Sequence, residues 1–148
     1  MNAPGTDIEA ELSERTEVAL FFKDSDYAFV NEPIMERALA SIAGLLAAGW
    51  QRQYRRAIEY TQLNIDAENA TDYAFFADRD AVEAAGDSSN KRIKICTVGM
   101  REFSAHLEPD TVRELSQSEF CASFAEAAAE LIQDYLAKVG ELKKRYYD

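Results

Sequence analysis

Residues 116–148 decide the fold of this chain, and they read SQSEFCASFAEAAAELIQDYLAKVGELKKRYYD. Ser116 and Glu119 have the spacing of a capping box, in which each side chain accepts a hydrogen bond from the other residue's backbone N–H. Apolar residues then recur every three or four positions, which predicts one core-facing helix of about thirty residues. Its apolar face comprises Phe120, Phe124, Ala127, Leu131, Tyr135, Val139, Leu142 and Tyr146, widened by Ala128, Ile132 and Leu136.

A β-hairpin is predicted before this helix. Ile93, Ile95 and Thr97 alternate with other residues, and Phe103, Ala105 and Leu107 do the same after a turn at 99–101. A single register places both apolar sets on one face of the hairpin, which is the pattern of half-buried antiparallel strands. The opposite face then carries Arg92, Lys94, Glu102, Ser104 and His106.

The N-terminal 30 residues are ambiguous. A capping box at residues 6–9 predicts a helix from Asp7 to about Arg15, with Ile8 and Leu12 on one face. The β-branched and aromatic residues of 18–22 and 27–30, on either side of a polar turn at 23–26, favour a second hairpin. A continued helix stays open as an alternative, because periodicity does not distinguish short apolar runs.

Helices are predicted through the middle of the chain. Asn31 and Pro33 suit a helix start, and Gly49 is expected to end or bend this helix before a second one at 50–64. After a loop at 66–71, a third helix is expected from Thr71 and Asp72 to Ala85, with a strand at 73–76 as the competing interpretation. Residues 86–90 are expected to form a loop. The prediction is one α+β domain over residues 1–148.

Length and charge limit the function classes. The chain has 148 residues and a net charge of −11, with 47% hydrophobic residues, so one domain with a substantial core is expected. The charge argues against general binding to nucleic acid or to an anionic membrane, because both attract Lys and Arg. The start of the sequence lacks the charge and apolar run of a signal peptide, so a cytoplasmic location is expected.

The negative charge is concentrated in two segments. Residues 1–36 and 59–89 each carry −7, residues 37–58 carry +4, and residues 90–148 carry −1. The patch at 50–56 contains Arg52, Arg55 and Arg56, which we expect to pair with acids of the protein itself rather than with nucleic acid. The candidate partner-binding residues are the acids of the two segments, namely Asp24, Asp26, Glu32, Asp66, Glu68, Asp72, Asp78 and Asp80.

Catalytic and metal-binding patterns have little support. His106 is the only histidine, and Glu102, Ser104 and His106 would form one row along a strand without a nucleophile elbow. One histidine and the separated Cys96 and Cys121 give no zinc spacing, so the cysteines are expected to be small buried residues. No glycine-rich loop suggests a nucleotide, and we expect no cofactor.

These observations favour a small acidic binding protein without enzymatic activity. The most concrete form is a bacterial immunity protein or antitoxin that masks the basic active site of a toxin such as a nuclease, because opposite charge speeds such an association. One alternative is a secretion chaperone or adaptor that uses apolar helix faces, with a homodimer as one outcome. A second alternative is a small enzyme that uses His106 with a carboxylate.

Overall fold

The computed structural model describes residues 8–13, 17–22, 31–60 and 69–147, and within them the side chains of 31–49, 51 and 69–147. The elements follow in the order β1 (Ile8–Ser13), β2 (Glu17–Phe22), α2 (Glu32–Tyr60), α3 (Ala70–Asp80), β3 (Glu83–Asp87), β4 (Ile93–Val98), β5 (Glu102–Leu107), α4 (Thr111–Glu114) and α5 (Gln117–Tyr147). The chain is therefore an α+β protein, as the sequence predicts.

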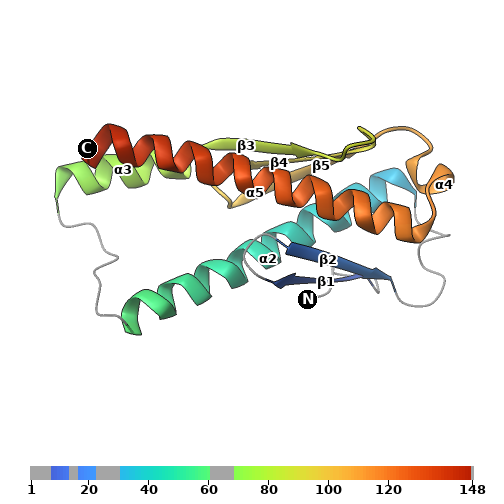
Figure 1. Ribbon diagram of the computed structural model, residues 1–148, viewed down its shortest axis with the longest axis horizontal. Coiled ribbons are helices and arrows are strands. Elements are labelled where there is room, and N and C mark those ends of the chain that lie inside the picture. Colours follow the sequence, from blue (N-terminus) through green and yellow to red (C-terminus); the bar gives the residue numbers. More distant parts are fainter. Residues whose placement is uncertain (1–7, 14–16, 23–30, 61–68, 148) are drawn as a thin grey trace.

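Two antiparallel sheets lie on opposite sides of the long helices (Figure 1). One sheet has three strands in the order β3-β4-β5, and the other is the hairpin β1-β2. Helix α5 contacts β3 and β4 of the first sheet and β2 of the second, while α2 contacts β5 and β1. The two helices thus join the sheets into one structure.

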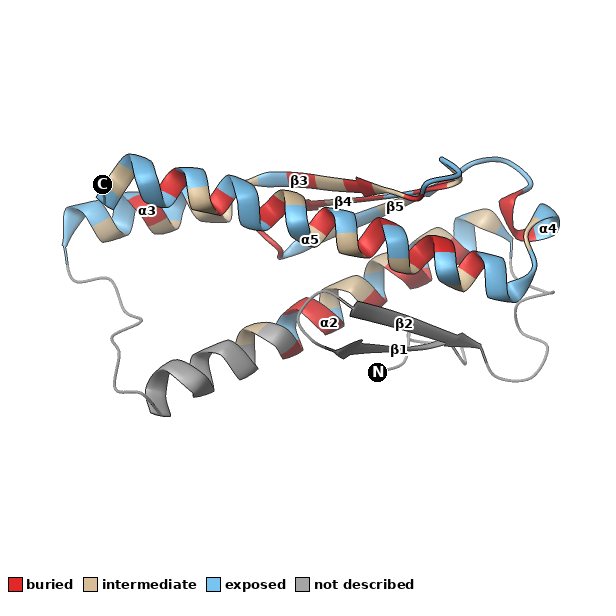
Figure 2. Cartoon of the chain, in the orientation of Figure 1, coloured by how far each residue is buried: buried red, intermediate tan, exposed pale blue. Residues whose placement is uncertain are grey.

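Helix α5 begins and packs as its sequence predicts. Ser116 Oγ accepts a hydrogen bond from the Glu119 N–H at 3.1 Å, and Glu119 Oε1 accepts one from the Ser116 N–H at 3.0 Å. Figure 2 shows buried residues at regular intervals along α5. The core consists largely of its aromatic and aliphatic face and the matching faces of α2 and the three-stranded sheet. Leu136 differs from the prediction, since it is 44% exposed.

The predicted hairpin at residues 93–107 is also confirmed. Ile93 pairs with Leu107, Ile95 with Ala105, and Thr97 with Phe103. Ile93, Ile95, Thr97 and Leu107 are buried, so the sheet turns this face toward the core. The other face carries the polar set, because neighbouring residues of a strand point to opposite sides.

Side chains from α5 cover the free edge of strand β3. The Ala85 N–H donates to Asp134 Oδ2 at 3.1 Å, and Lys138 Nζ donates to the Glu83 carbonyl at 2.8 Å. A Cβ placed on Gly86 would lie 2.0 Å from the Ala127 carbonyl oxygen, so only glycine fits where α5 crosses the strand. Covering an edge in this way prevents it from pairing with another chain.

Several sequence predictions about the elements are wrong. Residues 8–13 form a strand instead of a helix, because the spacing of Ile8 and Leu12 also fits a period of two and the segment pairs with β2. The partner of residues 17–22 is therefore β1, while residues 23–30 lie outside the described part. Gly49 neither ends nor interrupts α2, since packing of a long helix outweighs the roughly 1 kcal/mol penalty of one glycine.

The helix predicted from Thr71 to Ala85 is α3, and it is shorter than expected. It begins after Asn69, whose side chain accepts a hydrogen bond from the Asp72 N–H at 2.9 Å, and it ends at Asp80. The small residues of 84–86 form strand β3, where they allow the close approach of α5. Residues 73–76 are helical, so the competing strand interpretation is wrong.

Candidate functional site

Two of the predicted contact residues, Asp72 and Asp78, are bonded to the end of α5. The Tyr147 hydroxyl donates to Asp72 Oδ1 at 2.5 Å, and the Tyr146 hydroxyl donates to Asp78. Phe75 is buried, and its ring centre lies 5.4 Å from that of Tyr147 and 6.1 Å from that of Tyr146. Because each hydroxyl donates to a carboxylate, the pKa of both tyrosines is raised. These contacts hold α3 against α5.

Asp80, the third predicted residue of α3, faces the hairpin β4–β5. Its Oδ2 lies 3.4 Å from the Arg101 guanidinium, and its Oδ1 lies 3.8 Å from that of Arg79. Asp72, Asp78 and Asp80 thus each have a partner within the protein, so they stabilise the packing of α3 rather than form a free binding surface. We call the contacts of Asp72 with Tyr147 and of Asp78 with Tyr146 the clasp between α3 and α5.

The remaining predicted residues do not join this group. Glu32 lies at the start of α2, where its Oε1 accepts a hydrogen bond from the Val112 N–H at 3.1 Å and so caps α4. Figure 1 shows α3 and α4 at opposite ends of the molecule, so Glu32 is far from the acids of α3. The other predicted contacts lie outside the described residues: Asp24, Asp26, Asp66 and Glu68.

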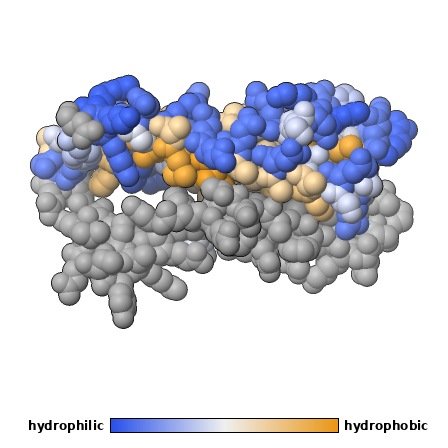
Figure 3. All heavy atoms as spheres, in the orientation of Figure 1, coloured by the Kyte–Doolittle hydropathy of each residue, from blue (hydrophilic) through white to orange (hydrophobic). Residues whose placement is uncertain are grey.

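A different acidic surface lies on α5. Residues 117–137 contain four acids and no Lys or Arg. Glu126 and Glu130 are one helical turn apart and exposed, and within the described ranges neither has an ion-pair partner. With Gln133 and Ala137 they follow a helical spacing along the exposed side of α5, which we call the α5 acidic row. Figure 3 shows mainly hydrophilic residues over the upper part of the described surface and a band of hydrophobic residues below them.

The charge count by segment concealed the α5 acidic row. Residues 90–148 carry nearly zero net charge because Lys138, Lys143, Lys144 and Arg145 follow the acids. On a helix, residues 117–137 and 143–145 occupy separate lengths, so Lys143, Lys144 and Arg145 lie apart from Glu126 and Glu130, although Lys138 lies 3.1 Å from Asp134. Counting charge within the predicted helix would have found the row.

His106 lies on the exposed face of the three-stranded sheet. Its side chain is 66% exposed, and its ring nitrogens lie 3.5 Å from Glu36 and 3.6 Å from Glu108. Glu102 and Ser104 share its strand face, as expected, and both are exposed. Use of His106 in catalysis therefore stays a prediction.

Cys96 and Cys121 are free thiols, and both are half-buried instead of buried as expected. Burial raises the pKa of the Cys121 thiol. Within the described ranges, no group of three His, Cys, Asp or Glu residues is arranged to hold a metal ion. Among those same residues, no helix has the length and apolar character needed to cross a membrane.

Comparisons with known proteins give no relative: no family model matches the chain, and neither the curated proteins nor the solved structures contain a significant match.

Proposed function

We propose that this protein is a non-enzymatic inhibitor of a basic protein, in the manner of an immunity protein or antitoxin that masks a toxin's active site. The observation that carries the proposal is the α5 acidic row, in which Glu126 and Glu130 are exposed and have no cationic partner among the described residues. A toxin that acts on nucleic acid needs a basic surface for its substrate, so an acidic surface competes for the same contacts.

The helix that carries the row suits this role. Helix α5 is anchored by its buried face, and its contacts with both sheets fix its position. A rigid surface loses little conformational entropy on binding, and exposed acids on that surface speed the encounter with an oppositely charged partner. The α3 acids contribute less in this proposal, because their carboxylates already bond within the protein.

A secretion chaperone or adaptor is the second candidate. Ile34 and Leu45 on α2 are 39% and 41% exposed, and Ser41 and Ala48 share their helical side. An exposed apolar helix face suits a partner helix or a second copy. Light scattering after size-exclusion chromatography tests this candidate: a stable dimer that Leu45→Glu dissociates would favour it over the inhibitor.

The inhibitor proposal is tested with two variants of equal charge. Glu126→Gln with Glu130→Gln removes two acids from the α5 acidic row, and Glu108→Gln with Asp110→Asn removes two from the loop before α4. Each changes the net charge from −11 to −9. The binding partner is first isolated with the wild-type protein as bait, and its toxicity and its inhibition are then measured with both variants.

We expect the α5 variant to associate on the order of tenfold more slowly with the partner at low salt, and to protect cells less. The loop variant should behave like the wild type. Equal inhibition by the two variants, or a captured partner that is acidic and not toxic, would refute the proposal.

A further inference from the structure

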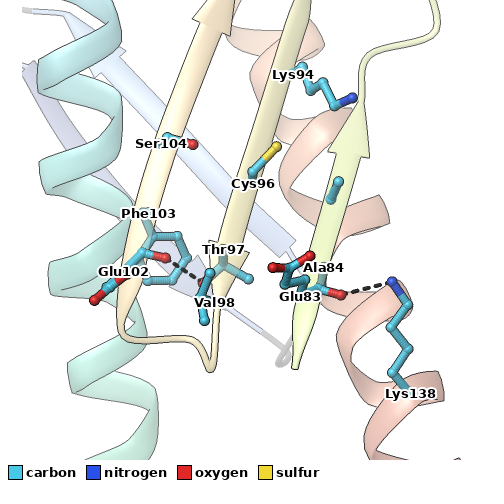
Figure 4. A pocket seen from close by; sticks show the side chains of 11 residues that line it. Glu83, Ala84, Lys94, Cys96, Thr97, Val98, Glu102, Phe103, Ser104 and Lys138 are labelled. Carbon is cyan, nitrogen blue, oxygen red and sulfur yellow. Dashed lines mark hydrogen bonds between the residues drawn. The ribbon is translucent and has the colours of Figure 1, made fainter. Parts of the chain in front are cut away.

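Among the described residues, no helix packs on the outer face of the three-stranded sheet, and the strand register arranges that face in three rows. Figure 4 views the sheet from this side, with the helices behind it. Cross-strand neighbours come from the pairings of β3 with β4 and β4 with β5. The rows are Glu83–Val98–Glu102, Ala85–Cys96–Ser104 and Asp87–Lys94–His106.

The middle row consists only of small residues, and it forms the floor of a cleft. Ala85, Cys96 and Ser104 lie side by side across the strands, while longer side chains stand on both sides of them. Residues of all three strands and Lys138 of α5 line this open cleft of about 530 Å³. Such a volume exceeds that of a single amino-acid side chain, so a segment of a partner could enter.

One rim of the cleft is acidic. Glu83 is exposed, and Figure 4 shows its carboxylate directed over the cleft. Lys138, which also lines the cleft, binds the backbone carbonyl of Glu83 and lies 3.1 Å from Asp134 Oδ2, and it makes no direct ion pair with the Glu83 carboxylate. Glu102 stands at the other end of the same row, also exposed, with half-buried Val98 between the two acids.

The middle of the opposite rim is positively charged, because Lys94 lies there. Lys94 lines the cleft and lies between Asp87 and His106 in its row. A cation is therefore attracted to the rim with Glu83 and repelled from the middle of the rim with Lys94. This asymmetry favours one orientation of a charged group that enters.

We propose that this cleft binds a cationic side chain, Arg or Lys, presented by the basic partner. The inference rests on the proposed function and adds a second contact to the α5 acidic row. The apolar stem of the side chain lies over Val98 and the floor of small residues, and its charged end lies near Glu83, while Glu102 adds negative charge from the far edge of the sheet. Long basic side chains combine these two kinds of contact.

Cys96 provides a direct measure of occupancy, because its thiol lies on the cleft floor. Alkylation of the wild-type protein by N-ethylmaleimide is followed by mass spectrometry of the two cysteine-containing peptides. Cys121, on α5 and away from the cleft lining, is the internal reference. The probes are a blocked tetra-arginine peptide and a blocked tetra-glutamine peptide, at low ionic strength.

We expect tetra-arginine to slow alkylation of Cys96 about twofold at the peptide concentration that half-fills the cleft, because only the free protein reacts, and to leave Cys121 unchanged. Tetra-glutamine should have no effect. Glu83→Gln with Glu102→Gln should abolish the protection, whereas Glu108→Gln with Asp110→Asn should keep it. Unprotected Cys96 at saturating tetra-arginine, or protection that survives the loss of both rim acids, would overturn the inference.

The two proposals fail in different ways. Inhibition that depends on Glu126 and Glu130 without protection of Cys96 by peptide or partner would refute the cleft and leave the inhibitor. Protection of Cys96 by tetra-arginine in a protein that neutralises no basic partner would refute the inhibitor and leave a cleft for cationic side chains.

Discussion

Gly86 offers the sharpest test of how α5 packs on the sheet, through the substitution Gly86→Ala. A Cβ at this position would lie 2.0 Å from the Ala127 carbonyl oxygen and 2.4 Å from the Leu131 nitrogen. Contacts below 3.0 Å essentially do not occur, so the strand and the helix must separate by about 1 Å or more. Both obstacles are backbone atoms of a helix, and no side-chain rotation relieves them.

The cost of this separation follows from the packing around it. Overpacking a core costs about 1–3 kcal/mol, and a clash with a helix backbone belongs at the upper end of that range. Moving α5 also strains the hydrogen bonds that Asp134 and Lys138 make to the edge of β3. We therefore expect Gly86→Ala to lower the free energy of unfolding by about 3 kcal/mol.

Urea unfolding followed by circular dichroism measures this loss. With a slope of about 2 kcal/mol per molar, the midpoint should fall by about 1.5 M. Gly140→Ala is the matched control, because a Cβ there meets nothing within 4 Å. It should raise stability by about 0.5–1 kcal/mol, since alanine favours a helix over glycine. A Gly86→Ala protein with the wild-type midpoint and slope would refute the packing of α5 on β3.

Four further predictions concern the ends of α5 and its contact with β3. Replacing Tyr146 and Tyr147 with Phe should speed hydrogen exchange in α3 and leave that in β4 unchanged; slow exchange in α3 would contradict the clasp. Because the pKa of both tyrosines is raised, their bonds to α3 stabilise the fold below about pH 10 and are lost as the pH rises through the raised values. Among the described tyrosines an ultraviolet titration should detect three that titrate late, because burial also raises the pKa of Tyr135, and ordinary values for Tyr146 and Tyr147 would argue against these bonds. Ser116→Ala should cost about 1 kcal/mol in urea unfolding, whereas Ser118→Ala should cost less, and equal effects would exclude the cap. The Ala85 N–H and Lys138 lower the pKa of Asp134, so its contribution is present above about pH 4 and lost as the pH falls through the lowered value. Asp134→Asn should then destabilise the protein at neutral pH and have little effect at pH values below that pKa, and a loss independent of pH would be inconsistent with the carboxylate's role.

The candidate site was less predictable than the fold. The sequence analysis selected acids by local charge, but charge in a sequence does not reveal which carboxylates find partners. Tyr146 and Tyr147 are far from Asp78 and Asp72 in the chain, and only folding brings them together. Conversely, Glu126 and Glu130 were concealed by the basic residues that follow them.

The sequence by itself determined α5, its cap and the hairpin of β4 and β5. These elements are long or regular, so one period explains many residues and the alternatives would expose their apolar faces. Ser116 and Glu119 act within one turn of helix, so their pairing needs no distant partner.

Only the tertiary structure decided the short elements and the chemical role of the acids. Residues 8–13 and 83–87 carry too few apolar residues to distinguish a helix from a strand, and pairing with a neighbouring strand settles each one. The net charge of −11 likewise does not show which acids stay exposed, and only the folded structure does. Folding joins the acids of α3 to α5 and to Arg101, and leaves those of the α5 acidic row exposed, because contacts between distant residues form only when the elements pack.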